Sequence, residues 1–218
     1  MRYFKNINYS SAFKRLLILF IPIFLMPFGI ACYYACGLGA DPFSIFVDGE
    51  HVITGLTYGE VTTINNTILL TLMVFFGRKY INIGTIITSF TTGPLIDASL
   101  DLILLYFPSA TTPLIMRAMI LLIGCVAFAV GVGVYISVSL GIGPVEFISL
   151  FIVDRTNISL KYVRIALDAL FTILGYLMGG VVGIGTILGV LATGPIIEYT
   201  LKLAEEPVNR FAGPMHLR

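Results

Sequence analysis

Long apolar stretches are the feature that most constrains this chain, because a helix that spans a bilayer needs about 20 consecutive, mainly apolar residues. Of the 218 residues, 57% are hydrophobic and 11% are charged, whereas a soluble domain carries about 25% charge. Six stretches are long enough to cross, at residues 16–36, 59–77, 81–107, 118–138, 160–180 and 182–203. They predict an all-α membrane protein with six transmembrane helices.

Two shorter segments, 42–54 and 144–154, each begin with a proline that follows a residue suited to cap a helix, Asp41 before Pro42 and Gly143 before Pro144. Each begins apolar and is too short to span, and the charged residues near its far end, such as Asp48 and Asp154, are expected to be exposed. This gradient fits a re-entrant half-helix whose N-terminus, deep in the membrane, presents free N–H groups to an anion or a dipole. It also fits an amphipathic helix that lies in the membrane interface.

The distribution of positive charge predicts the orientation, because cytoplasmic loops are rich in Lys and Arg. With six spans and the N-terminus inside, twelve Lys and Arg residues fall in the cytoplasm and Arg117 alone falls outside. We therefore expect a multi-pass protein of the bacterial plasma (inner) membrane. Its N-terminal segment, 1–14, and its C-terminal tail, 204–218, are both expected in the cytoplasm.

An internal repeat relates the two halves of the chain, 15–107 and 117–203. The matches include Gly, Pro, Thr and acidic residues, which coincide by chance far less often than Leu does. At shifts of 102 and then 101 residues the matched positions include Arg15 with Arg117, Gly29 with Gly131, Tyr33 with Tyr135, Pro42 with Pro144, Gly93-Pro94 with Gly194-Pro195, and Asp97 with Glu198. Each half holds three spans, so the second half is expected to be inverted relative to the first, as in many secondary transporters.

Three motifs carry a resemblance to a known group of proteins. They are LGADPF at 38–43, GTI at 84–86 and TGP at 92–94. Across residues 15–203 the chain resembles the YczE/YitT-type bacterial membrane proteins. The resemblance implies a multi-pass plasma-membrane protein, and it supplies no substrate and no catalytic residue.

The pairs Gly93-Pro94 and Gly194-Pro195 lie inside the third and sixth spans, where proline removes a backbone hydrogen bond and kinks the helix. The threonines just before them, Thr92 and Thr193, are able to satisfy a freed carbonyl. On that interpretation the kinks are structural. The alternative is that the broken backbone lines a cavity.

Acidic residues within spans are functional candidates, because charge in lipid is costly. Each also has a structural explanation. Asp168 and Glu198 have a basic partner one turn away on the same helix, Glu146 lies in the first turn of a half-helix, and Asp97 has Arg117 on the same side of the membrane. Asn66 aligns with Asp168, so a symmetric site would carry an amide on one side and an acid on the other. The candidate binding residues are Asp41, Ser44, Asn66, Thr92, Asp97, Glu146, Asp168, Thr193 and Glu198.

These features favour a transporter or channel for a small polar solute or cation, with its site between the repeats near the bilayer midplane. The alternative is a substrate-binding or accessory subunit of a larger complex, such as a vitamin-capture component. An enzyme is not expected, because the chain lacks HExxH and GxSxG motifs and both histidines lie outside the spans. We expect no cofactor, metal site or nucleic-acid partner, and three packing cysteines, Cys32, Cys36 and Cys125. The bilayer is the expected surrounding, and a homo-oligomer is compatible with the pattern.

The charge pattern predicts that residues 50 and 156 face opposite sides of the membrane. Single cysteines at Glu50 and Thr156, in a chain without native cysteines, would be treated with a membrane-impermeant thiol reagent in intact cells. We expect labelling at position 50 only, and labelling at 156 only after lysis. Labelling of both in intact cells would contradict the inverted arrangement.

Overall fold

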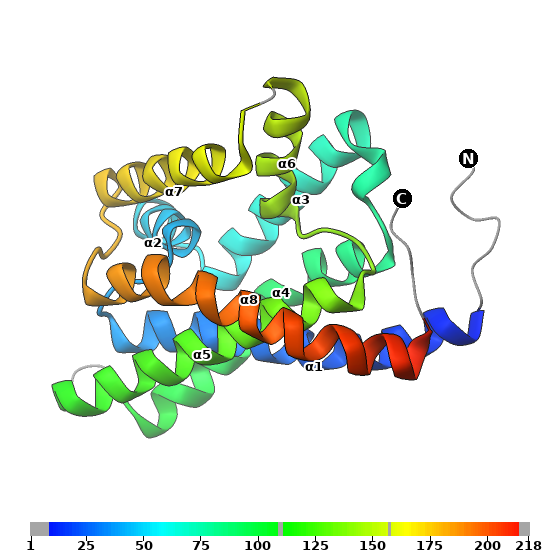
Figure 1. Ribbon diagram of the computed structural model, residues 1–218. Helices are drawn as coiled ribbons and strands as arrows, with labels where there is room; N and C mark the ends of the chain where they lie inside the picture. Colours follow the sequence, from blue (N-terminus) through cyan, green and yellow to red (C-terminus); the bar gives the residue numbers. More distant parts are fainter. Residues whose placement is uncertain (1–8, 109–110, 157, 214–218) are drawn as a thin grey trace.

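The computed structural model describes residues 9–108, 111–156 and 158–213, and within those ranges every regular element is helical (Figure 1). The ends of both predicted cytoplasmic segments, 1–8 and 214–218, lie outside the described residues. The elements are α1 (Tyr9–Cys36), α2 (Pro42–Thr54), α3 (Tyr58–Phe76), the short 3-10 helix η1 (Arg78–Tyr80), α4 (Ile83–Tyr106), α5 (Leu114–Val138), α6 (Pro144–Thr156), α7 (Leu160–Leu177) and α8 (Ile184–Ala212).

The helix boundaries repeat along the chain at the same shifts as the sequence motifs. Helices α1 and α5 end at positions that match, Cys36 and Val138, and α2 and α6 are each 13 residues long and begin with the matched prolines. Helices α4 and α8 begin at Ile83 and Ile184, which also match. The starts of α2 and α6 were therefore predicted correctly, and α1 and α5 end where their predicted spans end, at 36 and 138.

Four helices are long and apolar enough to cross a membrane: residues Ser10–Cys36 of α1, then α3, α5 and α8. Helix α7 carries Lys161, Arg164 and Asp168, and α4 carries Asp97 and Asp101, and neither meets the same criterion. The chain is thus a membrane protein with several apolar helices, and the prediction of six spans stays a prediction. Helix α8 also runs on to Ala212, well beyond the span predicted to end at 203.

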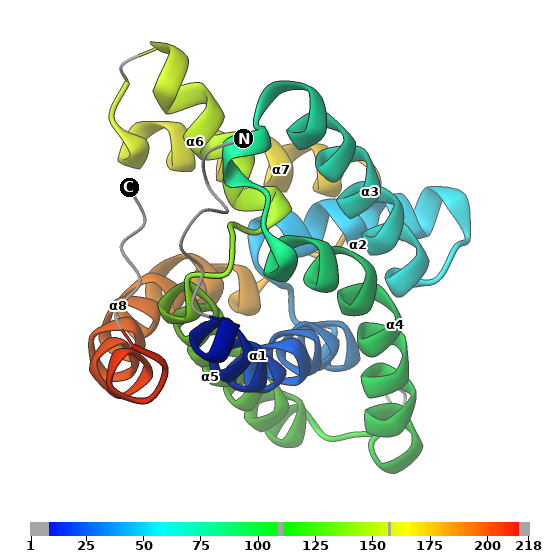
Figure 2. The ribbon, with the colours of Figure 1, turned by 90° about the vertical axis from the view of Figure 1, so that its right-hand side faces the viewer.

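Helices α1 and α5 form a central pair that runs antiparallel between α4, which packs on α1, and α8, which packs on α5 (Figure 2). An arginine near the start of each helix caps the end of the other. Nη1 of Arg15 donates to the Val138 carbonyl at 2.9 Å, and Nε of Arg117 donates to the Cys36 carbonyl at 2.6 Å. Cations at helix C-termini satisfy free carbonyls and complement the helix dipole.

The Arg15 side chain is fully buried, with 0% exposure. Its Nη2 also donates to the Asn209 side chain at 2.8 Å and to the Gly213 carbonyl at 2.7 Å. One guanidinium therefore joins the start of α1 to the ends of both α5 and α8. This contact explains why α8 continues to Ala212 instead of ending at the predicted membrane boundary.

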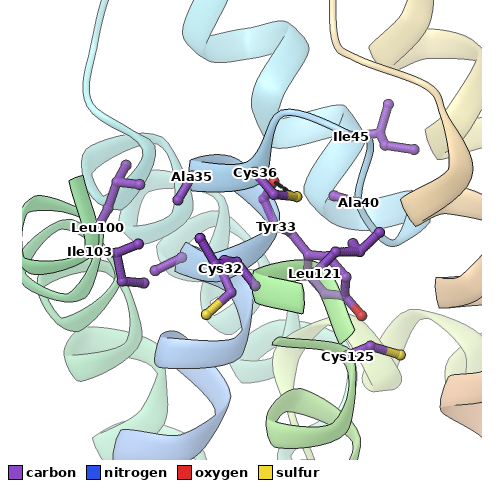
Figure 3. Close-up of a cluster of buried hydrophobic side chains, with 12 residues drawn as sticks. Cys32, Tyr33, Ala35, Cys36, Ala40, Ile45, Leu100, Ile103, Leu121 and Cys125 are labelled. Carbon is purple, nitrogen blue, oxygen red and sulfur yellow. Dashed lines mark hydrogen bonds between the residues drawn. The ribbon is translucent and has the colours of Figure 1, made fainter. Parts of the chain in front are cut away.

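The interface of α1 with α5 also contains the principal buried cluster, in which Tyr33 lies beside Leu121 (Figure 3). Cys32, Cys36 and Cys125 are all free and buried here, which confirms the prediction that they are packing residues. The two backbones approach closely at Gly124, which has no side chain. A Cβ added there would lie only 2.5 Å from the Cβ of Cys32.

Two matched hydrogen bonds cross between the halves. The Gly84 amide at the start of α4 donates to the Leu140 carbonyl at 2.9 Å, and the Gly185 amide at the start of α8 donates to the Leu38 carbonyl at 2.8 Å. The loops that supply these carbonyls turn at Gly39 and Gly141, whose φ angles of +94° and +121° favour glycine. Each half thus supplies a backbone carbonyl that accepts from the first turn of a helix in the other half, at equivalent positions.

The packing of the outer helices differs between the halves. Helix α3 packs along α4, where Gly59 and Gly93 bring the backbones together, and α2 packs on α7 at Gly49 and Gly175. The matching helix pairs, α7 with α8 and α6 with α3, are packed less closely. Helix α7 makes little contact with α8 along the described residues, and a Cβ on Gly194 would meet nothing within 4 Å.

Replacement of Arg15 by Met should lower the free energy of unfolding by about 3 kcal/mol, because the carbonyls that it caps lose a charged donor in a buried place. Thermal unfolding of the purified protein in detergent, followed by circular dichroism, measures the loss. Arg210→Met is the control, since Arg210 is exposed in the last turn of α8. Equal melting temperatures for the two variants would refute the capping role.

The matched glycines allow a second test of packing. In Gly93→Ala the new Cβ would overlap the Thr63 hydroxyl and the Gly59 carbonyl, so the variant should lose roughly 1–3 kcal/mol. Gly194→Ala should be neutral or stabilising by up to about 1 kcal/mol, because alanine favours helix and its Cβ has open space. The same unfolding assay applies, and a reversed order would contradict the difference between the halves.

Candidate functional site

A cavity of about 390 Å³ lies between the two halves and is the candidate site. Its volume is in the range of small-molecule pockets. Helices α1, α3 and α4 line it from the first half and α5 from the second, and the starts of α2 and α6 both reach it. Five of the nine predicted binding residues lie in its lining: Asp41, Ser44, Asn66, Thr92 and Glu146.

At the start of α2, Asp41 is the N-cap with an extended backbone, and Pro42 occupies the first turn. The Asp41 carboxylate accepts from the Ser44 amide at 3.3 Å and from the Ser44 hydroxyl at 2.5 Å. A carboxylate of the chain itself therefore occupies this helix N-terminus. The expected anion site is already filled at α2, and the cavity gains a negative charge.

At the start of α6, Gly143 supplies no side chain that could cap the helix. Glu146, three residues on, folds back so that one of its carboxylate oxygens lies beside Gly143. This carboxylate makes no hydrogen bond or ion pair with any residue that the structure describes. Both helix starts thus bring a carboxylate to the cavity, one held in a cap and one without a partner.

The gradient expected along both short helices is present, since Pro42 and Pro144 are buried and Thr54 and Thr156 are exposed. Asp48 is a correction. It was expected at the exposed end of α2, yet it is buried because its carboxylate accepts from the Tyr58 hydroxyl at 3.0 Å and from the Val181 amide at 2.7 Å. It ties α2 to α3 and to the turn before α8.

Asn66 and Thr92 line the cavity from α3 and α4. The Asn66 amide is buried and makes a long hydrogen bond of 3.5 Å to the Ser89 carbonyl. Thr92 donates to the Thr88 carbonyl at 2.7 Å, so it does not satisfy the carbonyl of residue 90 that Pro94 leaves without a donor. Both α4 and α8 continue through their prolines, Pro94 and Pro195.

Among the lining residues that were not predicted as site residues, two bear directly on the chemistry of the site. Tyr135 is 6% exposed, and its hydroxyl lies close to the Thr85 and Thr88 side chains but makes no hydrogen bond of normal geometry with a described residue. The match of Tyr135 with Tyr33 in the repeat was the one available signal. Arg164 of α7 is the other, and it was considered only as a partner of Asp168.

Asp168 lies outside the cavity lining and pairs with Arg164, with 3.3 Å between Oδ1 and Nε. This is the ion pair that its spacing on the helix allowed. The charges of Arg164 and Asp168 both lie close enough to the Asp41 carboxylate to interact with it electrostatically. The predicted alignment of Asn66 with Asp168 therefore places only the amide at the cavity.

The other predicted residues lie elsewhere. Asp97 accepts from the Gly59 amide at 2.7 Å and the Thr57 hydroxyl at 2.5 Å, so it caps α3 and has no contact with Arg117. Glu198 is exposed and pairs with Lys202 at 2.7 Å. The Thr193 hydroxyl is buried beside Tyr33, away from the cavity, and Gly194 borders open space.

The far end of α6 is tied to η1 at the protein surface. The Asp154 carboxylate accepts from Lys79 at 2.5 Å and also from the Tyr80 hydroxyl. These hydrogen bonds hold the pKa of Asp154 below its usual value and raise the pKa of Lys79 above its own. Because both groups are exposed, this link is easily screened and broken.

Comparison with known proteins places the chain among uncharacterised membrane proteins. It is 27% identical over 191 residues to the uncharacterized membrane protein YczE of Bacillus subtilis (strain 168), covering 87% of this chain and 86% of YczE. It is 29% identical over 187 residues to the uncharacterized protein YyaS of the same organism, covering 85% and 91%. An uncharacterized protein of Haemophilus influenzae (strain ATCC 51907 / DSM 11121 / KW20 / Rd) is 24% identical over 196 residues, covering 89% and 87%.

No solved structure matches the chain. A family model matches residues 13–202, which include all the helices that line the cavity. The resemblance to YczE-type proteins is thereby confirmed, and the chain belongs to the family of unknown function DUF6198.

Proposed function

We propose that this protein carries a small polar solute across the bacterial plasma membrane, as a transporter or channel with its site between two inverted repeats. The observation that carries the proposal is the convergence of both half-helix starts, at Asp41 and Gly143, on one cavity. Discontinuous helices whose ends meet between repeats are the usual form of a solute site in secondary transporters. No covalent step is part of the proposed activity.

The reciprocal contacts support the inversion of the repeats. Arg15 caps α5 and Arg117 caps α1, so these two helices have opposite directions. If both span the bilayer, the halves that they begin are inserted in opposite orientations. Together with the charge count, this supports the expectation that both termini lie in the cytoplasm.

The unequal packing of the outer helices supports movement between two arrangements. Helix α3 is closed on α4 at Gly93, while α7 stands away from α8 at the matched Gly194. In inverted repeats, an exchange of these two arrangements transfers access to the cavity from one membrane face to the other. The exposed Lys79–Asp154 link is weak enough to break during such a change.

The proposal predicts that a bulky side chain in the cavity stops solute movement. Proteoliposomes loaded with a bacterial metabolite extract would be assayed by mass spectrometry for solutes lost faster than from empty vesicles. In Thr92→Phe the ring fills the cavity, and we expect efflux to fall to the level of vesicles without protein. Thr91→Phe is the matched control, because Thr91 makes the same hydrogen bond to its own helix, at 2.8 Å, and faces an apolar groove outside the cavity.

Efflux should be normal in the control. If no solute leaves faster with the wild-type protein than without it, the transport proposal fails. If both variants are equally active, the cavity is not the route.

A further inference from the structure

We propose that the cavity binds an organic cation with an apolar body, that is, a small amine with one ammonium group and an aromatic or aliphatic skeleton. This inference rests on the proposed function and names the class of solute. It follows from three independent properties of the lining: its charge, its apolar walls and one hydroxyl without a partner.

The charge around the cavity is negative. Asp41 and Glu146 bring two carboxylates to the lining, and Arg164 brings one guanidinium. Asp168 pairs with that guanidinium at 3.3 Å, so its charge is compensated within α7. Neither lining carboxylate forms an ion pair with a described residue, and Arg164, already paired with Asp168, cannot balance both, which is a costly arrangement in an apolar surrounding. A bound cation removes that cost.

The walls of the cavity are mainly apolar. Phe43 and Phe128 contribute aromatic rings, and Met26, Ile30 and Val132 contribute aliphatic surface. A volume of about 390 Å³ is much larger than an inorganic ion needs, and the described residues hold no group of three acidic, histidine or cysteine side chains that could bind a metal ion. Aromatic faces attract ammonium groups and also pack against an apolar skeleton.

The Tyr135 hydroxyl is the third observation. It is buried in the cavity wall and makes no hydrogen bond with a described residue. Buried hydroxyls are normally paired, so one without a partner in a cavity wall has hydrogen-bonding capacity that a ligand or solvent could use. Its oxygen is able to accept a hydrogen bond from an ammonium N–H. The Glu146 carboxylate lies near enough to interact electrostatically with the same hydroxyl.

An anion fits this site poorly. The N-terminus of α2 already carries the Asp41 carboxylate, and the Glu146 carboxylate lies beside the start of α6. A bound anion would lie near both, in a place where little water screens the repulsion. The lining therefore selects positive charge, although helix N-termini by themselves attract anions.

Isothermal titration calorimetry on the purified full chain in detergent tests the inference, with benzyltrimethylammonium as the probe. We expect saturable binding at one site. Tetramethylammonium, which lacks the apolar body, and benzenesulfonate, which carries the opposite charge, should bind about tenfold more weakly or less. No binding of benzyltrimethylammonium, or equal binding of benzenesulfonate, would overturn the proposal.

Two variants locate the site while keeping its shape. Asp41→Asn retains an oxygen that caps α2, because Asn and Asp are equally good caps, and Glu146→Gln retains the length of the side chain. Each should weaken binding of the probe about tenfold, which is about 1.4 kcal/mol, and Tyr135→Phe should weaken binding of phenylethylamine. Glu198→Gln is the control, since this exposed acid lies outside the cavity. If the three cavity variants bind like the control, the inference is wrong.

The two proposals can fail separately. Binding of the probe that depends on Asp41 and Glu146, without any solute efflux from proteoliposomes, would remove transport and leave an amine-binding membrane protein. If Thr92→Phe stops efflux but the probe does not bind, the transport proposal stands and the organic-cation proposal is wrong.

Discussion

The rest of the structure depends on the reciprocal capping of α1 and α5 by arginine. A guanidinium is costly to bury, and Arg15 is fully buried without a carboxylate partner among the residues that the structure describes. It is tolerated because the ends of α5 and α8 present carbonyls that have no donor in their own helices. Arg117 does the same for the end of α1. These contacts fix the antiparallel register of the central pair, and that register sets where the loops before α2 and α6 lie.

The cavity is a consequence of that register. The short loops that follow α1 and α5 lead directly into Pro42 and Pro144, so α2 and α6 both begin beside the central pair. A helix N-terminus in such a place is electropositive. A carboxylate lies beside each one, from Asp41 in the first half and from Glu146 in the second. The two halves thus reach a similar local charge with different residues at different positions. This difference is why the cavity is not a symmetric site.

Local signals in the sequence predicted the helices well, and contacts between helices were beyond them. Proline after a capping residue predicted the starts of α2 and α6, and apolar length predicted the long helices. Five of the predicted binding residues lie at the cavity, because helix starts and repeat symmetry point to its position. Asp97 could not be assigned, because its role as a cap depends on α4 packing against the start of α3, some 40 residues away. The same holds for Asp48, and for Tyr135, whose hydroxyl makes no hydrogen bond of normal geometry with any described residue.

The crossed bonds of Gly84 with Leu140 and of Gly185 with Leu38 affect how the chain matures during translation. Gly185 is synthesised 101 residues after Gly84, and ribosomes add about 5–20 residues per second, so the first half waits roughly 5 to 20 seconds for its last partner. During that interval the Leu38 carbonyl has no amide to accept from, and α1 lacks its antiparallel neighbour until α5 is complete at Val138. The amino-terminal half is therefore a nascent intermediate that the insertion machinery and lipid must hold, and the native packing forms only when α8 emerges.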